Sequence, residues 1–213
     1  EIQKLILQFI IVGAYLLSVA LAGGTTETVI PFLGSVDLGF FYYILAAVFI
    51  VGMVNAVNFT DGIDGLNTSV TLVVALVFSV IAMLLNRVGL SLYAAAIVGA
   101  MIGFLFWNAN PAKVFMGDTG SLFLGGAVCA LAFGVDMPIL LILIGVIYIV
   151  EILSVVLQVT YFKISHGKRI FKMAPIHHHF EMCGWNENKI CFVFSGVTLL
   201  AGIIGVLLAV FGC

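Results

Sequence analysis

Seven long apolar segments are the feature that most restricts how this chain can fold. Each approaches the roughly 20 residues that a helix needs to cross a bilayer, and only 8% of the residues are charged, against roughly 25% in soluble domains. A membrane β-barrel would instead alternate polar and apolar residues over about ten positions. We therefore predict an all-α integral membrane bundle, one polytopic domain over residues 1–213 with about seven transmembrane helices. The predicted spans are Lys4–Ala22, Phe40–Val57, Leu66–Leu85, Ser91–Trp107, Gly120–Gly134, Ile139–Tyr161 and Ile190–Phe211.

The segments outside these spans carry further predictions. Between the first two spans, Thr25–Leu38 alternates strand-forming and turn residues, which predicts a small external β-hairpin. The fifth span is short, so a tilted or re-entrant helix also fits it. The cysteines form no CxxC pair, and we expect single thiols at Cys129, Cys183, Cys191 and Cys213.

Basic residues divide unequally between the two sides of this topology. Arg87 falls on the side of the hairpin and of Cys213, whereas the other seven lysines and arginines fall on the opposite side. Because cytoplasmic loops carry the excess of basic residues, the side with seven is predicted to be cytoplasmic. No basic run points to a nucleic-acid partner. The seven residues are Lys4, Lys113, Lys163, Lys168, Arg169, Lys172 and Lys189.

The first of three polar stretches on that side is Asn55–Gly65, which holds two carboxylates and two carboxamides in an otherwise apolar sequence. An ionisable group near hydrocarbon is costly and needs a partner, a metal or water. Asp61 and Asp64, three residues apart, can share one face of a beginning helix. Asp64 or Asn67 can also be a simple cap of the helix that follows.

The second stretch is Asn108–Ser121, where glycines flank Asp118 just before a predicted helix. Free amides at a helix start favour an anion such as phosphate. A carboxylate there can instead hold Mg²⁺, which typically takes one or two carboxylates, substrate phosphates and waters. Helix capping by Asp118 or Thr119 is the structural alternative. Lys113 is read as an ordinary basic residue of the cytoplasmic side.

The third stretch is His166–Glu187, which contains three adjacent histidines, His177 to His179, beside basic residues. Three adjacent side chains cannot all face the same way, so at least one is expected to serve the structure. Histidines beside basic residues suit pyrophosphate binding or proton transfer at neutral pH. A zinc site made with Cys183 is conceivable, although the spacing matches no common pattern.

Glu151 is a lone carboxylate in the middle of the sixth predicted span. Such a residue can mark a proton or ion path through the membrane. It can equally be hydrogen-bonded inside the bundle, at a bend in the helix. The sequence leaves both interpretations open. An ion-coupled transporter using Asp61, Asp64 and Glu151 is therefore the rival from another functional class.

Four motifs resemble the polyprenyl-phosphate N-acetylhexosamine-1-phosphate transferases over essentially the whole chain. The run Pro-Ile-His-His-His-Phe-Glu narrows the resemblance to the MraY branch. That resemblance implies transfer of phospho-N-acetylmuramoyl-pentapeptide from its UDP donor to undecaprenyl phosphate, with Mg²⁺, giving lipid I and UMP at the bacterial cytoplasmic membrane. The motifs are Asn55-x-x-Asn58-x-x-Asp61-Gly-x-Asp64-Gly-Leu, Asn108-Ala-x-Pro-Ala-Lys, Phe-Met-Gly-Asp118-Thr-Gly-Ser and Ala-Pro-Ile-His177-His-His-Phe-Glu.

The resemblance also suggests roles for individual residues. Asp118 is the leading Mg²⁺ ligand, and Asp61 is a second carboxylate for the metal or for positioning the nucleophile. Asn55 and Asn58 would hold this acidic centre. His177 joins the two aspartates as a predicted catalytic residue.

The remaining predicted site residues bind substrate. Asp64 and Asn108 suit hydrogen bonds at the uridine end, where the ring of Phe115 can stack. His178 and His179 would contact the pyrophosphate or the sugar, together with His177.

This chain departs from the family pattern upstream. The family carries a further Asp-Asp motif and several helices before the first motif, and nothing here matches them. The resemblance therefore implies the C-terminal portion of a roughly ten-helix enzyme, and it leaves a homodimer open. A sister transferase that uses UDP-N-acetylglucosamine for another glycan is the nearest rival, but it should lack the histidine run.

Overall fold

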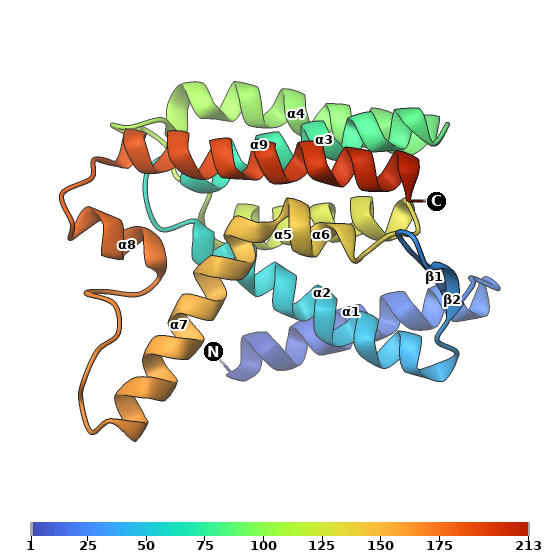
Figure 1. Ribbon diagram of the computed structural model, residues 1–213, viewed down its shortest axis with the longest axis horizontal. Helices are drawn as coiled ribbons and strands as arrows, with labels where there is room; N and C mark the ends of the chain where they lie inside the picture. The colour runs from blue at the N-terminus through green and yellow to red at the C-terminus, as the bar shows by residue number, and fades with distance from the viewer. Residues whose placement is uncertain (1, 213) are drawn as a thin grey trace.

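The computed structural model describes residues 2–212, so Glu1 and Cys213 lie outside the described residues. Seven of its helices are long and apolar enough to cross a membrane, and they run largely side by side (Figure 1). The predicted helical bundle and its number of spans are confirmed. The seven are α1 (Ile2–Leu21), α2 (Phe40–Thr60), α3 (Leu66–Leu84), α4 (Val88–Asn108), α5 (Gly117–Gly134), α7 (Val146–Ile164) and α9 (Glu187–Phe211).

A two-stranded hairpin covers one end of the bundle, as predicted. Strands β1 (Glu27–Ile30) and β2 (Gly34–Asp37) pair antiparallel. Two backbone bonds tie the hairpin to the helices: the Val29 amide donates to the Asp136 carbonyl at 2.9 Å, and the Phe32 amide donates to the Gly212 carbonyl at 2.6 Å. The hairpin therefore joins the ends of α5 and α9.

The sixth predicted span, Ile139–Tyr161, is wrong as a single helix. The structure divides it at Gly145 into α6 (Leu140–Ile144) and α7. The Gly145 amide closes the end of α6 by donating to the Leu141 carbonyl at 2.8 Å. Figure 1 shows that α7 then slants away from the other helices toward the end of the bundle opposite the hairpin. The sequence did not predict this division, because the residues on both sides of Gly145 are apolar and the hydropathy shows no break there.

Two other boundaries differ from the sequence prediction. Helix α2 continues three residues past Val57 to Thr60, which places Asn58 on the helix. The short helix α8 (Ile176–Glu181) was not predicted, and it holds the three histidines. Six residues are too few for a periodic pattern to identify a helix.

Helices α2 and α5 cross with almost no space between them. A Cβ added to Gly125 would lie 2.6 Å from the Val54 Cα atom and 3.1 Å from its carbonyl oxygen. Only glycine therefore allows this contact between a helix and its neighbour's backbone, as is common in membrane bundles. One turn toward the end of the bundle opposite the hairpin, the same two helices present Asn58 and Ser121 to each other.

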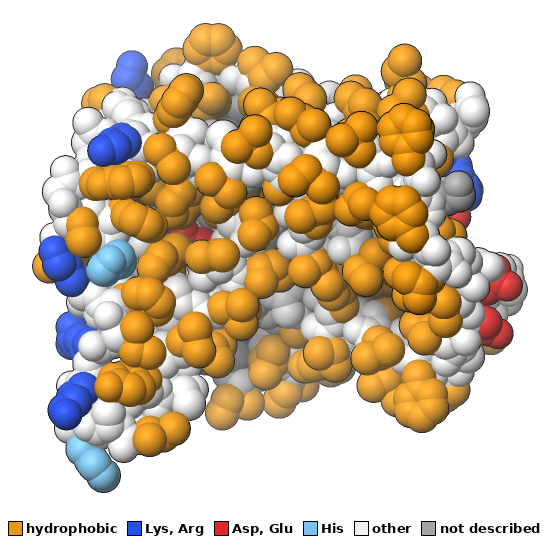
Figure 2. Space-filling view, viewed as in Figure 1, with side chains coloured by type: hydrophobic (Ala, Val, Ile, Leu, Met, Phe, Trp, Pro, Cys, Tyr) orange, Lys and Arg blue, Asp and Glu red, His pale blue; other side chains and the backbone are white. Residues whose placement is uncertain are grey.

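The surface matches a membrane environment. Large apolar side chains are exposed along most of the long helices, whereas α5 exposes Phe123, and Figure 2 shows apolar side chains covering much of the visible face. Most of the lysines and arginines visible in Figure 2 gather at the end that carries α8, and acidic side chains are also visible at the hairpin end. Arg87, the single basic residue predicted there, pairs with Asp136 at 2.6 Å.

We predict opposite effects for alanine at two neighbouring glycines of α5. Gly125→Ala should lower the free energy of unfolding by about 1–3 kcal/mol, because the new methyl group meets the backbone of α2. Gly126→Ala meets nothing within 4 Å and should be neutral or stabilising by up to about 1 kcal/mol. Denaturation of both variants in lipid or detergent measures the difference, and equal effects would contradict the close crossing.

Candidate active site

Four polar side chains meet where α1, α2 and α5 come together. The Asn58 amide donates to Asp118 Oδ1 at 3.0 Å and to Ser121 Oγ at 2.8 Å. The Lys4 ammonium donates to Asn58 Oδ1 at 2.9 Å and to Asp118 Oδ2 at 3.1 Å. The Asp118 carboxylate is exposed, and hydrogen bonds from Asn58 and Lys4 fix its orientation.

Asp61 supplies a second carboxylate at this end of α2. It follows the last residue of α2 and is only partly exposed. Burial raises the pKa of Asp61 to about 6, and the negative charge of Asp118 adds to this rise. The charges of two carboxylates from distant parts of the chain therefore act on each other.

Asp64 does not cap α3. The cap position is Gly65, and no side chain closes that end of the helix. Instead, Asp64 Oδ2 accepts bonds from the Ala112 amide at 2.8 Å and from Asn110 Nδ2 at 3.3 Å. Its own amide donates to Glu187 Oε2 at 2.9 Å. Asp64 therefore links the turn after α2 to the loop before α5 and to the start of α9.

Asn108 and Phe115, both predicted at the uridine end, lie in different environments. Asn108 is buried: it accepts a bond from Thr68 Oγ1 at 2.6 Å and donates one to the Val114 carbonyl at 3.0 Å. Phe115 is 71% exposed in the same loop. Asn108 thus shapes the loop from beneath, and Phe115 leaves its ring free to stack.

The three histidines face different directions, as the sequence required. His177 is fully buried and pairs with Glu151, their Nδ1 and Oε2 atoms 3.0 Å apart. His178 is partly exposed and pairs with Glu181. His179 accepts a bond from the Lys172 amide at 3.1 Å. Of the two interpretations of Glu151, the structure therefore shows the hydrogen-bonded one: the side chain is paired inside the bundle, soon after the bend at Gly145.

Asn55 lies one turn from Asn58 on α2 and bonds to a residue that the sequence analysis did not single out. Its Nδ2 donates to Gln8 Oε1 at 2.7 Å. Lys4, interpreted above only as a basic residue of the cytoplasmic side, contacts Asp118 directly. The signal was present: Lys4 and Gln8 are four residues apart at the start of an apolar helix, so both lie on one face.

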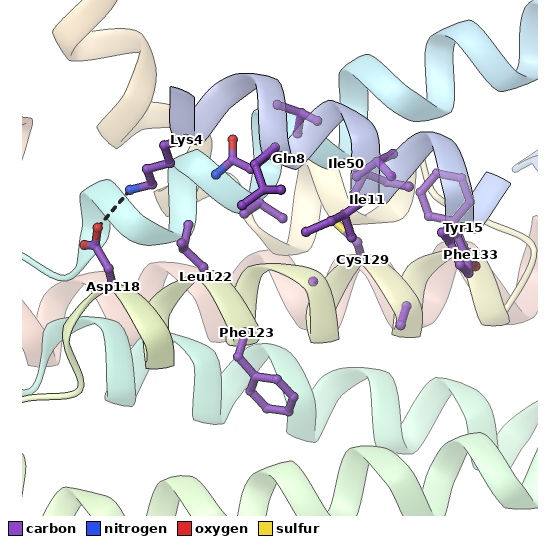
Figure 3. A pocket seen from close by; sticks show the side chains of 16 residues that line it. Lys4, Gln8, Ile11, Tyr15, Ile50, Asp118, Leu122, Phe123, Cys129 and Phe133 are labelled. Atoms are coloured by element: carbon purple, nitrogen blue, oxygen red, sulfur yellow. Dashed lines mark hydrogen bonds and ion pairs between the residues drawn. The ribbon is translucent and has the colours of Figure 1, made fainter. Parts of the chain in front are cut away.

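An apolar groove of about 760 Å³ leads to this cluster. It runs between α1, α2 and α5, with Lys4 and Asp118 at one end and Tyr15 and Phe133 toward the other (Figure 3). Figure 3 also shows that Phe123 points to the opposite side of α5 from Leu122. The groove thus runs along the helices to Lys4 and the Asp118 carboxylate.

The carboxylates fit Mg²⁺ better than zinc. No group of three or more His, Cys, Asp or Glu side chains within residues 2–212 is placed to hold a metal, and His177 is occupied by Glu151. Mg²⁺ needs only one or two protein carboxylates when phosphates and waters complete its shell. Asp61 and Asp118 are the described residues that could supply them.

Comparison with known proteins identifies the family. The model of glycosyl transferase family 4 matches residues 1–136, which include the first two polar stretches and Asp118. The chain belongs to this family. Family membership disfavours the ion-coupled transporter, and so does the pairing of Glu151 with His177.

Curated relatives of this family member are named phospho-N-acetylmuramoyl-pentapeptide-transferase. One from Clostridium perfringens is 52% identical over 199 residues, which cover 93% of this chain and 61% of the relative. One from Clostridium botulinum is 52% identical over 84% of this chain and 56% of the relative. One from Listeria monocytogenes is 48% identical over 88% of this chain and 59% of the relative. The chain thus spans about three fifths of the length of these relatives.

We predict that Asn108 acts through the loop that it supports. Asn108→Ala leaves the buried Thr68 hydroxyl and the Val114 carbonyl without their partner, which should cost about 1–3 kcal/mol of stability. The loop should then be cut faster by trypsin at Lys113. Asn110→Ala, in the same loop, removes only an exposed 3.3 Å bond to Asp64 and should change stability by less than about 1 kcal/mol. Equal trypsin sensitivity of both variants would contradict this role.

Proposed function

We propose that this chain carries the catalytic carboxylates of a phospho-N-acetylmuramoyl-pentapeptide transferase. The reaction joins the phospho-sugar of UDP-N-acetylmuramoyl-pentapeptide to undecaprenyl phosphate and releases lipid I and UMP. The observation that carries the proposal is the cluster of Lys4, Asn58 and Asp118 at the end of an apolar groove. The pKa of Asp61 responds to the charge of Asp118. The names of relatives about 50% identical to this chain support the choice of donor.

Catalysis of transfer between phosphates depends mostly on positioning the reactants and on neutralising their negative charge. Mg²⁺, held by Asp118 and Asp61, would neutralise negative charge on the reacting phosphates. Asn58 fixes the orientation of the Asp118 carboxylate through its 3.0 Å bond. Asn55 supports the same face of α2 one turn away. The Lys4 ammonium adds a positive charge beside Asp118.

The donor would lie over the loops that surround these carboxylates. Phe115 can stack on the uracil ring, because its own ring is exposed. Asp64 and Asn108 hold that loop through bonds to its backbone. His178 and His179, both partly exposed, would contact the pyrophosphate or the sugar. Direct contact by the buried His177 stays a prediction.

The acceptor is a phosphate on a long hydrocarbon chain, and the groove suits such a molecule. Its lining is almost entirely apolar, but Lys4 and Asp118 lie at one end. A chain lying along α1 and α5 would therefore bring its phosphate to Lys4. The excess of basic residues at this end of the bundle supports a cytoplasmic position for the reaction in the bacterial inner membrane.

The proposal is tested by lipid I formation in vesicles that contain this chain, undecaprenyl phosphate, the donor and Mg²⁺. A second preparation should add the part of the Clostridium perfringens relative that lies outside the matched region. Product from UDP-N-acetylmuramoyl-pentapeptide, with little from UDP-N-acetylglucosamine, is expected in at least one preparation. Preference for UDP-N-acetylglucosamine would support the sister transferase, and no product in either preparation would overturn the proposal.

Asp118→Asn should lower lipid I formation by roughly a hundredfold or more, because a metal-binding charge worth about 3 kcal/mol in the transition state is lost. The Asn58 bond to Oδ1 can survive this change, so the variant should fold. Asp136→Asn is the matched control: it removes a carboxylate paired with Arg87 at the hairpin end and should leave turnover unchanged. Near-normal turnover of Asp118→Asn at saturating Mg²⁺ would remove this residue from the metal role.

A further inference from the structure

Glu151 and His177 form a buried pair that the proposed chemistry does not use directly. Both side chains are 0% exposed, and their Oε2 and Nδ1 atoms are 3.0 Å apart. Glu151 lies on α7, an apolar helix of the bundle, and His177 lies on α8. Burial of a carboxylate without a hydrogen-bonding partner would be strongly unfavourable. The contact therefore holds α8 against α7 in one arrangement.

The other side of the His177 ring lies directly beneath the turn that carries Asp61. A Cβ added to Gly62 would lie 2.3 Å from His177 Nε2 and 2.6 Å from its Cε1 atom. Within residues 2–212, neither Nε2 nor Glu151 Oε1 has a hydrogen-bond partner in the protein. The ring thus packs between Glu151 and the backbone of Gly62, one residue from the Asp61 carboxylate.

The preceding turn of α7 reaches the other catalytic carboxylate through a similar chain of buried contacts. The Tyr148 hydroxyl lies 2.7 Å from Thr71 Oγ1, which bonds to Asn67 Oδ1 at 3.1 Å. Asn67 Nδ2 lies 3.3 Å from the sulfur of Met116, the residue before the first turn of α5. Asp118 is in that first turn. One face of α7 therefore supports both carboxylate-bearing segments from inside the bundle.

We propose that Glu151 is a positioning residue for the transferase. It fixes the His177 ring with Nδ1 protonated and donating to Oε2, and the ring in turn holds the Asp61–Gly62 turn at the distance from Asp118 that the reaction needs. Glu151 touches neither substrate nor metal in this role. The proposal rests on the proposed function for its effect on turnover, but the state of the His177 ring can be observed without any reaction.

Glu151→Gln is the main test, because it keeps the shape of the side chain and removes its charge. An amide can donate to Nδ1 as well as accept from it, so the single tautomer is no longer enforced. Nitrogen-15 NMR of histidine-labelled full chain in lipid vesicles, with His177→Gln to assign the signal, reports protonation at Nδ1. We expect a hydrogen-bonded, protonated Nδ1 in the unchanged protein and a shifted or divided signal in Glu151→Gln.

The kinetic prediction separates positioning from donor binding. Glu151→Gln should lower kcat for lipid I formation by about tenfold or more, the range found for residues that orient a functional group, with the donor KM changed by less than about threefold. Because both residues act as one unit, Glu151→Gln combined with His177→Gln should be no slower than the slower single variant. Thr198→Val is the control, since that buried hydroxyl bonds only to its own helix at Phe194.

Gly62→Ala provides a second approach that leaves the buried pair chemically intact. Its methyl group displaces the ring from the opposite side, so it should shift the same NMR signal and lower kcat even where Glu151→Gln does not fold. An unchanged His177 signal in Glu151→Gln, a loss of kcat below threefold, or multiplied effects in the double variant would overturn the proposal. Absence of product from the unchanged protein would instead overturn the proposed function, and the NMR experiment would still decide the role of Glu151 toward His177.

Discussion

The close crossing of α2 and α5 at Val54 and Gly125 sets the spacing on which the rest of the site depends. Backbone contact at that point leaves no freedom in the separation of the two helices one turn further along. Asn58 can therefore bond to both Ser121 and Asp118 with ordinary distances. The positions of the carboxylates at the ends of these two helices therefore depend on Gly125, a glycine in the apolar part of the bundle.

Polar groups inside the bundle also determine which segments lie together, because an unpaired polar atom in hydrocarbon is costly. The Thr71 hydroxyl pairs with Tyr148, the Thr68 hydroxyl with Asn108, and the Glu151 carboxylate with a buried imidazole. Each contact joins helices or loops that are distant in the sequence. Buried polarity in this protein therefore specifies which segments lie together at the catalytic end.

Hydropathy was sufficient to predict the seven spans, and the alternation of strand-forming and turn residues was sufficient to predict the hairpin. They could not predict the break at Gly145, because apolar residues continue on both sides of it. The motifs singled out Asn55, Asp118 and His177, but not their contacts with Gln8, Lys4 and Glu151, respectively. Local spacing places Lys4 and Gln8 on one face of a helix, but the residues that this face contacts depend on the packing of helices far apart in the chain.

The break at Gly145 explains how one apolar segment can serve two parts of the molecule. Before it, α6 packs on α9, where a Cβ on Gly205 would lie 2.8 Å from Ile144. After it, α7 changes direction and packs on α2 and α8. Tyr148 and Glu151 lie within the first two turns after the break, and both face inward. A continuous helix would keep the direction of α6, so these two side chains owe their contacts at the catalytic end to the bend.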